Sequence, residues 1–312
     1  MVAVQKAENV TVKQAGVDFN LADKWLQFAQ VSQASLKAYA KGIKRLAEYF
    51  SANGITSPTR ENLLKYREYL SRRYATKTAN LYITTARLFF EFLAAEGIIR
   101  VNVAAHLKTL KDSQFHKKNA LSIQQVRTVN SGIDTESLKG KRDSAIFALM
   151  TVCGLRCCEI TRAKVVDFEI VGDTAILRVF GKGHNSADTP IAVPNNVAVK
   201  VIEYLKARGV GMVTEPLFAS CSNRNYGGEL TVNSVSRVIK NYFRANGIDS
   251  KKITAHSCRH TFATVALKNG ADLTQVSQML RHKSLAVTMI YVDELNYLEN
   301  QAASIASAAF GI

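Results

Sequence analysis

The chain has 312 residues, of which 47% are hydrophobic and only four are proline, a composition typical of folded proteins and not of disordered ones. No apolar stretch approaches the roughly 18–20 residues that cross a bilayer, and the N-terminal residues lack the apolar core of a signal peptide, so we expect a cytoplasmic protein without membrane contact. The formal net charge of +16 favours nucleic acid as the partner, the alternative being a basic surface that is merely solvated.

The length predicts two domains, and both halves of the chain are basic. Residues 1–111 carry 17 lysines and arginines against 8 acidic residues, and residues 112–312 carry 24 against 17. After an N-terminal extension over residues 1–19, hydrophobic residues recur at helical spacing through residues 20–107, which predicts a helical bundle. Its expected helices are Leu21–Ala29, Ser35–Asn53, Arg60–Arg73, Thr76–Glu96 and a short one near Val103–Leu110.

Basic residues beside this bundle are candidates for DNA binding. The helix expected over Ser35–Asn53 has a single apolar stripe, and its lysines and one arginine lie off that stripe. Residues 108–119 are polar and basic without apolar periodicity, and we interpret them as a linker that lies along DNA. The candidate DNA-binding residues are Lys37, Lys41, Lys44, Arg45, Lys117 and Lys118.

Residues 120–292 are predicted to form a second, mixed domain that begins with a helix. Ser122 and Gln125 match a capping box, which indicates a helix start. The fold class is therefore mainly α with a small β-meander: a helical bundle followed by an α+β domain. The helices expected from residue 120 onward are Ile123–Asn130, Arg142–Cys153, one starting near Arg156, Asn196–Arg208, Val232–Asn246, His256–Asn269, Leu273–Arg281 and Glu294–Ala308.

A three-stranded meander is expected within this domain, at Asp167–Val171, Ala175–Phe180 and Thr189–Val193. The loop between the second and third strands holds Lys182 between two glycines. Such a lysine is a mobile cation at a hairpin tip, and most lysines of this kind are only solvated. Upstream of the meander, Arg156 and Glu159 lie three residues apart on one helical face, a spacing that is most often a surface ion pair.

A third group of candidates follows the meander. His256 and Arg259 share a helical face, with His260 one step further round, and so combine a proton carrier with a guanidinium suited to phosphate. Taken alone, such a histidine is more often a capping or core residue. His282 precedes Tyr291 by nine residues, and an isolated tyrosine is usually a core residue.

Together these residues occur in the order and spacing that characterise one family. The chain resembles the tyrosine recombinase, or phage integrase, family over nearly all of residues 120–292, and is similar to its two-domain members such as Xer recombinases and mobile-element integrases. The helical N-terminal region resembles the family's core-binding domain, which clamps DNA. One departure is Arg281, where relatives commonly have glycine before the histidine. The motifs are Gly154-Leu155-Arg156-x-x-Glu159, Gly181-Lys182-Gly183, His256-x-x-Arg259-His260-Thr-Phe-Ala-Thr264, and His282 before Tyr291.

The resemblance implies metal-free cleavage of a DNA phosphodiester. Tyr291 would attack phosphorus to form a 3′-phosphotyrosyl bond, while Arg156 and Arg259 neutralise the phosphoryl oxygens. Lys182 would protonate the leaving 5′-oxygen. The remaining assignments are His256 for proton transfer at the attacking hydroxyl, His282 for hydrogen bonding to the phosphate, and Glu159 and His260 for support of the catalytic residues.

Partners follow from the same resemblance. We expect duplex DNA with a specific recombination site, a homotetramer on two DNA sites, accessory DNA-bending or directionality proteins, and no cofactor. A mobile-element integrase is slightly favoured over Xer-like resolution of chromosome or plasmid dimers, in a prokaryotic setting. The alternatives are a type IB topoisomerase and an inactive DNA-binding accessory protein, against which the complete set of catalytic residues argues.

The C-terminal segment over residues 293–312 is expected to be a protomer-contact helix. Residues 284–312 contain no lysine or arginine, and Leu298, Ala302, Ile305 and Ala309 recur at helical spacing. Folding back on its own domain is the alternative.

The five cysteines form an odd set without paired spacing, which argues against a disulfide framework and a zinc site. We expect reduced, mostly buried thiols and no metal. They are Cys153, Cys157, Cys158, Cys221 and Cys258.

Overall fold

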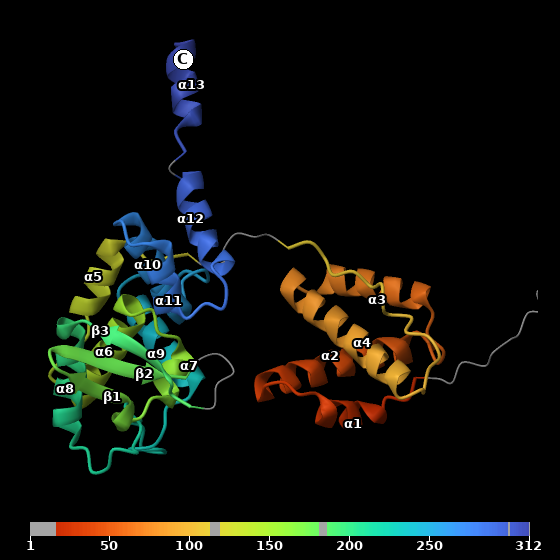
Figure 1. Ribbon diagram of the computed structural model, residues 1–312, viewed down its shortest axis with the longest axis horizontal. Helices are drawn as coiled ribbons and strands as arrows, with labels where there is room; N and C mark the ends of the chain where they lie inside the picture. The colour runs from red at the N-terminus through yellow and green to blue at the C-terminus, as the bar shows by residue number, and fades with distance from the viewer. Residues whose placement is uncertain (1–16, 113–118, 181–185, 299, 312) are drawn as a thin grey trace, which may run out of the picture. The chain divides into compact units, whose positions relative to one another are not determined.

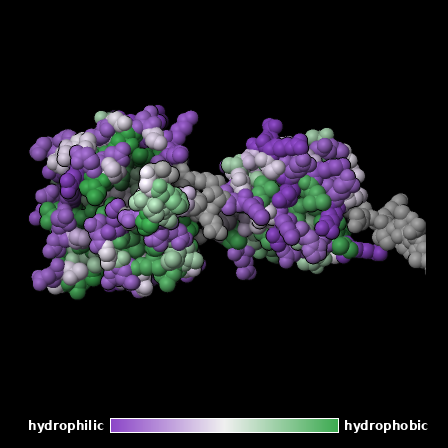
Figure 2. All heavy atoms as spheres, turned by 90° about the horizontal axis from the view of Figure 1, so that it is seen from above, coloured by the Kyte–Doolittle hydropathy of each residue, from purple (hydrophilic) through white to green (hydrophobic). Residues whose placement is uncertain are grey.

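A computed structural model describes residues 17–112, 119–180, 186–298 and 300–311. The chain divides into two compact units, residues 1–113 and 114–312, and each is considered separately. On the face seen in Figure 2, hydrophilic side chains predominate in both units and apolar ones gather in patches. None of the helices in the described ranges has the length and apolar character needed to cross a membrane.

In the described part of the first unit, four helices form a bundle (Figure 1), and aromatic side chains contribute much of its core. Phe50, Phe89 and Phe90 are buried at its centre. Helices α2 and α4 pack closely because Gly42 has no side chain: a Cβ there would lie 2.7 Å from the Thr85 hydroxyl. The helices are α1 (Leu21–Phe28), α2 (Gln33–Ala52), α3 (Arg60–Arg73) and α4 (Thr76–Ala95).

The prediction of a helix near Val103–Leu110 is wrong, since this segment forms a turn followed by chain without regular secondary structure. The Leu107 N–H donates to the Ala104 carbonyl in a turn, and other backbone groups of the segment bond to side chains of the bundle. The Asn80 side chain accepts a hydrogen bond from the Leu110 N–H at 2.7 Å and donates one to its carbonyl at 2.9 Å, while Arg67 donates to the Lys108 carbonyl at 2.7 Å. These side chains hold the segment against α3 and α4.

The second unit is built around α6 and a small antiparallel sheet. The predicted meander is confirmed, in the order β1-β2-β3, with Leu177 opposite Ile191. Alternate residues of the sheet face the core, and α6 packs against α8, α9 and α10. The capping box at Ser122 is also confirmed. The elements are α5 (Ile123–Ser131), α6 (Leu138–Val152), α7 (Cys157–Arg162), η1 (Val165–Asp167), β1 (Phe168–Val171), β2 (Thr174–Val179), β3 (Thr189–Val193), α8 (Asn195–Arg208), α9 (Val232–Ala245), α10 (Ala255–Lys268), α11 (Leu273–Leu280), α12 (Ala286–Leu298) and α13 (Ala302–Phe310).

The C-terminal segment differs from the single helix predicted over Glu294–Ala308. Two helices are present, and Tyr291 lies inside the first of them, α12. Helix α13 begins at Ala302. Its N-cap residue, Gln301, makes no side-chain capping bond, and the Asn300 side chain accepts a hydrogen bond from the Ala302 N–H at 2.8 Å. Helix α13 contains no buried residue.

Candidate active site

The site begins with a sharp turn between α6 and α7. Gly154 has φ of +63°, and a Cβ there would lie 2.8 Å from a Leu280 methyl and 2.9 Å from the Phe262 ring. A side chain at this position would therefore strain the backbone and require these neighbours to shift. The turn brings Arg156 to the N-terminal cap of α7, one turn before Glu159.

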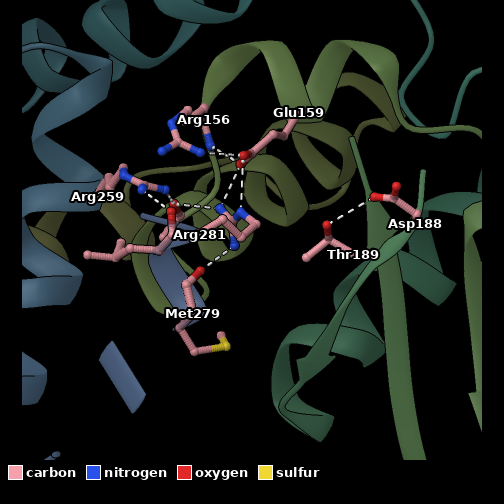
Figure 3. A network of polar contacts seen from close by, with 9 residues as sticks. Arg156, Glu159, Asp188, Thr189, Arg259, Met279 and Arg281 are labelled. Atoms are coloured by element: carbon pink, nitrogen blue, oxygen red, sulfur yellow. Dashed lines mark hydrogen bonds and ion pairs between the residues drawn. The ribbon is translucent and has the colours of Figure 1, made fainter. Parts of the chain in front are cut away.

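Glu159 is a buried carboxylate held by two arginines (Figure 3). It accepts hydrogen bonds from the Arg156 N–H and Nη1, both at 2.7 Å, and from Arg281 Nη2 at 2.7 Å and Nε at 3.1 Å. Burial raises the pKa of Glu159, but the charges of Arg281 and Arg156 and these hydrogen bonds outweigh it, so that the pKa is lowered. The carboxylate is thus ionised at neutral pH.

Arg259, on α10, is a second arginine predicted to bind phosphate, and it is 2% exposed. Its Nη1 donates to the Gly154 carbonyl at 2.7 Å, and its Nη2 donates to the Leu280 carbonyl. Burial, followed by the charges of Arg156 and Arg281, lowers the pKa of Arg259 to about 9. The guanidinium therefore remains charged at neutral pH. Arg259 shares the Gly154 carbonyl with Arg281, which together with Arg156 holds Glu159, and a group of three arginines of this kind is suited to an anion.

Two histidines of α10 lie in a row with Tyr291. The His256 and His260 ring centroids are 5.0 Å apart, and those of His260 and Tyr291 are 5.4 Å apart. Burial raises the pKa of Tyr291, although the charges of Arg259 and Arg156 lower it in part. The phenol is therefore protonated at neutral pH, and its use as a nucleophile requires a proton acceptor.

A cavity of about 290 Å³ adjoins the Tyr291 ring. The start of the second unit, at Asn119 and Ala120, lines it together with residues of α10 and α12. Glu294 also lines this cavity, and burial raises the pKa of its carboxyl group. Tyr291 is thus a protonated phenol that lies beside a row of two histidines and lines a cavity.

His282 is tied to the helix that carries Tyr291. Its Nδ1 lies 2.8 Å from the hydroxyl of Thr288, which is fully buried in α12. Its backbone N–H donates to the Ser277 carbonyl at 3.1 Å, which fixes it just beyond the end of α11. The half-buried ring of His282 is therefore oriented by both α11 and α12.

Three predicted residues, Lys182, Lys117 and Lys118, lie outside the described residues. At the base of the loop that contains Lys182, the Arg162 guanidinium lies 3.9 Å from the Phe180 ring centroid. The four basic residues predicted on the bundle are exposed along α2, and Arg45 forms an ion pair with Glu48 at 2.5 Å. They are Lys37, Lys41, Lys44 and Arg45.

Two residues of the site were not predicted from the sequence. Arg281 was noted only as a departure from a glycine, yet it makes two hydrogen bonds to Glu159. The signal available in the sequence was that an arginine stands at a position where relatives commonly have glycine. Thr288, the partner of His282, gave no signal beyond its position between His282 and Tyr291.

The cysteines are free, as expected, but the expectation that most are buried is wrong. Cys153 and Cys258 are buried, whereas Cys157 and Cys221 are half-buried and Cys158 is exposed. Burial raises the pKa of Cys153 and of Cys258 to about 12, which leaves both as protonated packing residues. Within the described ranges, no group of three histidine, cysteine or acidic side chains is arranged to hold a metal ion.

Solved structures share this fold. The XerH site-specific recombinase in a post-cleavage complex with palindromic difH substrate matches with a TM-score of 0.72 and 19% identity, over 95% of this chain and 85% of that one. A lambda integrase (75–356) dimer bound to a COC′ core site matches with a TM-score of 0.65 and 18% identity, over 86% of this chain and 94% of that one. The predicted fold class is confirmed.

Sequence comparisons give the family. The profile of the phage integrase family matches residues 119–296, and that of the phage integrase N-terminal SAM-like domain matches residues 24–97. Tyrosine recombinase XerC of Pelobacter propionicus is 31% identical over 270 residues, which cover 84% of this chain and 85% of the relative. Tyrosine recombinase XerD of Listeria monocytogenes is 26% identical over 283 residues, covering 87% and 93%. The chain therefore belongs to the phage integrase family of tyrosine recombinases and is a site-specific DNA recombinase.

Proposed function

We propose that Tyr291 is the nucleophile and that Arg156 and Arg259 bind the scissile phosphate. The observation that carries this assignment is the arginine cluster around Glu159, formed in the same unit as the row of His256, His260 and Tyr291. Charged guanidinium groups preorganised in a partly buried site stabilise the negative charge that develops on the phosphoryl oxygens.

The cleavage step is a transesterification. The Tyr291 oxygen bonds to phosphorus as its proton passes to a base, for which His256 is proposed, and His260 supports this pair. The bond from phosphorus to the 5′-oxygen breaks, and Lys182 supplies the proton that this oxygen takes up. His282 hydrogen-bonds the phosphate. The product is a 3′-phosphotyrosyl bond and a free 5′-hydroxyl, and one phosphoester bond replaces another, so rejoining needs no ATP.

Strand exchange follows when the 5′-hydroxyl of a second duplex attacks the phosphotyrosyl bond and releases Tyr291. This requires two DNA sites held together, and we propose a homotetramer for the purpose. A lambda integrase tetramer bound to a Holliday junction, which matches this fold with a TM-score of 0.68, supports that arrangement. Accessory DNA-bending or directionality proteins are a further proposed class of partner.

The N-terminal unit is proposed to grip the DNA backbone through α2. Lys37, Lys41 and Lys44 are exposed at helical spacing, on the side away from buried residues such as Leu46. Replacing these three lysines with glutamine should reduce the slope of log affinity against log salt by about 0.9 for each phosphate that the protein no longer neutralises. Lys117 and Lys118 are proposed to contact DNA from the linker over residues 108–119.

For the biological role we propose integration or excision of a mobile element. Dimer resolution is the second candidate, and the similarity to XerC and XerD proteins over most of the chain favours it. The two roles predict different DNA sites. Recombination of attachment-like repeats that flank the gene would support the first, and recombination confined to a chromosomal or plasmid dimer site would support the second.

A suicide DNA substrate, nicked beside the cleavage site, tests the mechanism. We expect a covalent protein–DNA product attached at Tyr291, and strand exchange when two intact sites are supplied. DNA binding without covalent capture would indicate an accessory protein. Covalent capture with relaxation of supercoils but no exchange between sites would indicate a topoisomerase.

A further inference from the structure

Arg281 occupies a backbone position that suits glycine. It caps the end of α11 with φ of 53° and ψ of 47°, and within the described ranges it is the sole non-glycine residue with positive φ. A side chain in this conformation brings Cβ close to the following carbonyl oxygen, a clash that glycine avoids. The arginine is instead held there by what its side chain contacts.

The Arg281 side chain joins two segments that are distant in sequence, the end of α11 and the turn that leads into α7. Two of its nitrogens contact both oxygens of Glu159, at 3.1 and 2.7 Å. Its Nη2 also lies 3.3 Å from the Gly154 carbonyl, and its Nη1 donates to the Met279 carbonyl. The turn that precedes His282 is thereby fastened to the start of α7 (Figure 3).

Arg281 shares a hydrogen-bond acceptor with each of the two arginines proposed to bind the phosphate. Glu159 accepts from Arg281 through both oxygens while it holds Arg156 Nη1 at 2.7 Å. The Gly154 carbonyl that accepts from Arg281 also accepts from Arg259 Nη1, at 2.7 Å. Displacement of Arg281 would therefore disturb Arg156 through Glu159 and Arg259 through Gly154.

We propose that Arg281 is a positioning residue of the recombinase site, which sets the placement of the Arg156 and Arg259 guanidinium groups through Glu159 and the Gly154 carbonyl. The inference rests on the proposed function in assigning the phosphate to those two arginines. Arg281 acts through its neighbours, because its Nε, Nη1 and Nη2 all donate to protein groups, namely the Glu159 carboxylate and the Met279 carbonyl.

The first test compares cleavage with binding in Arg281→Gly. This change suits the backbone conformation and removes the side-chain contacts. In single-turnover capture on the nicked substrate, we expect cleavage to slow on the order of ten- to a hundredfold, as for misplaced catalytic groups. DNA affinity should stay within a few-fold of wild type. Added guanidinium ion should restore part of the rate, whereas sodium chloride at equal ionic strength should not.

Arg142→Ala is the matched control. Arg142 also forms a buried ion pair, at 2.7 Å with Asp143, and donates to the Ala219 carbonyl in the same unit. Its removal should lower the melting temperature without changing the cleavage rate of the folded protein or creating a response to guanidinium. Equal slowing and equal rescue in both variants would overturn the proposal, since the effect would then reflect general disruption of a buried ion pair.

A double-variant comparison tests the route through Glu159. If Arg281 acts through Glu159, then Arg281→Gly combined with Glu159→Gln should cleave no more slowly than the slower single variant. If the losses in cleavage rate of the two single variants multiplied in the double variant, the route through Glu159 would be overturned.

Arg281→Lys is a second variant, for use if Arg281→Gly fails to fold, because it retains the positive charge. It should also cleave slowly, because an ammonium group cannot bond to both carboxylate oxygens in the planar geometry of a guanidinium. Cleavage at the wild-type rate in Arg281→Lys and in every folded Arg281→Gly sample would overturn the proposal. Absence of capture by wild-type protein, in contrast, would overturn the proposed function itself.

Discussion

The ring of His260 lies against that of Tyr291, with centroids 5.4 Å apart and planes inclined at 64°. The contact joins α10, which also carries Arg259, to α12, which carries the proposed nucleophile. Because Tyr291 is only 3% exposed, its proposed role as the nucleophile requires α12 to move when DNA binds.

Tyr291→Phe is expected to abolish covalent capture while DNA affinity stays within a few-fold of wild type. One hydroxyl is removed, but the ring packing on His260 and the phosphate contacts of the arginines remain. Gel shift and suicide-substrate assays on the same sample measure both properties. Tyr297→Phe, a change at an exposed tyrosine of the same helix, is the control and should cleave normally. Strand exchange by pure Tyr291→Phe protein would rule out this nucleophile.

Cleavage is expected to proceed in excess EDTA. In the proposed mechanism, Arg156 and Arg259 supply the positive charge that a metal ion would otherwise provide at the phosphoryl oxygens. The measurement is the rate of covalent capture with and without chelator, with the salt concentration held constant because binding depends on it. An absolute magnesium requirement in the cleavage step would contradict the mechanism.

Lys182→Ala is expected to cleave ordinary DNA slowly and to recover on a substrate in which sulfur replaces the bridging 5′-oxygen. A thiolate leaves without protonation, so the substrate bypasses the need for a general acid. His256→Ala should show no such recovery, because its proposed role is at the attacking oxygen. If the sulfur substrate restored cleavage by His256→Ala and not by Lys182→Ala, the proposed roles of His256 and Lys182 would have to be exchanged.

Glu159→Gln is expected to flatten the acid side of the stability profile. The folded pKa of Glu159 is lowered from its ordinary value of 4.5, so ionised Glu159 contributes stability that is present above about pH 4.5 and lost as pH falls through the folded pKa. Removal of this charge should cost on the order of 3–5 kcal/mol at neutral pH, as for a broken buried ion pair.

The measurement for Glu159→Gln is the free energy of unfolding from pH 3 to pH 7. Glu169→Gln, which removes an exposed ion pair with Arg178, is the control and should change stability by at most about 1 kcal/mol. A steep acid limb that survives in Glu159→Gln would show that other carboxyl groups govern it.

The order and spacing of motif residues such as Arg156 and Tyr291 were sufficient to predict the family, which the family profiles confirm. The contact of Arg281 with Glu159 was not predictable from helical spacing, since 122 residues separate the two. Where local pattern failed, a specific hydrogen bond decided the outcome. Asn80 takes the backbone groups of Leu110 that a helix would have used.

The break between α12 and α13 shows the same limit of periodicity. Apolar residues continue at helical spacing through the break, from Leu298 to Ala302, and therefore predicted one helix. In the structure a second helix begins at Ala302, whose N–H donates to the Asn300 side chain. Periodicity records which face is apolar, but it does not record where the backbone hydrogen bonds are interrupted.

Truncation after Asn296 is expected to leave the monomer folded and able to bind DNA, but to impair assembly of the paired-site complex and to change Tyr291 reactivity. The deletion removes α13, which buries none of its residues within the protomer, and exposed apolar side chains such as Tyr297, Ile305 and Phe310. A helix of this length is marginal in water unless it docks, which favours docking on a neighbouring protomer. Because α12 carries both Tyr291 and this tail, such docking would position the nucleophile.

Melting curves, gel shifts and suicide-substrate capture on the truncated protein provide the test. Normal paired-site complexes with normal exchange would show that the tail neither connects subunits nor regulates cleavage, whereas an unfolded product would indicate that the tail docks on its own unit.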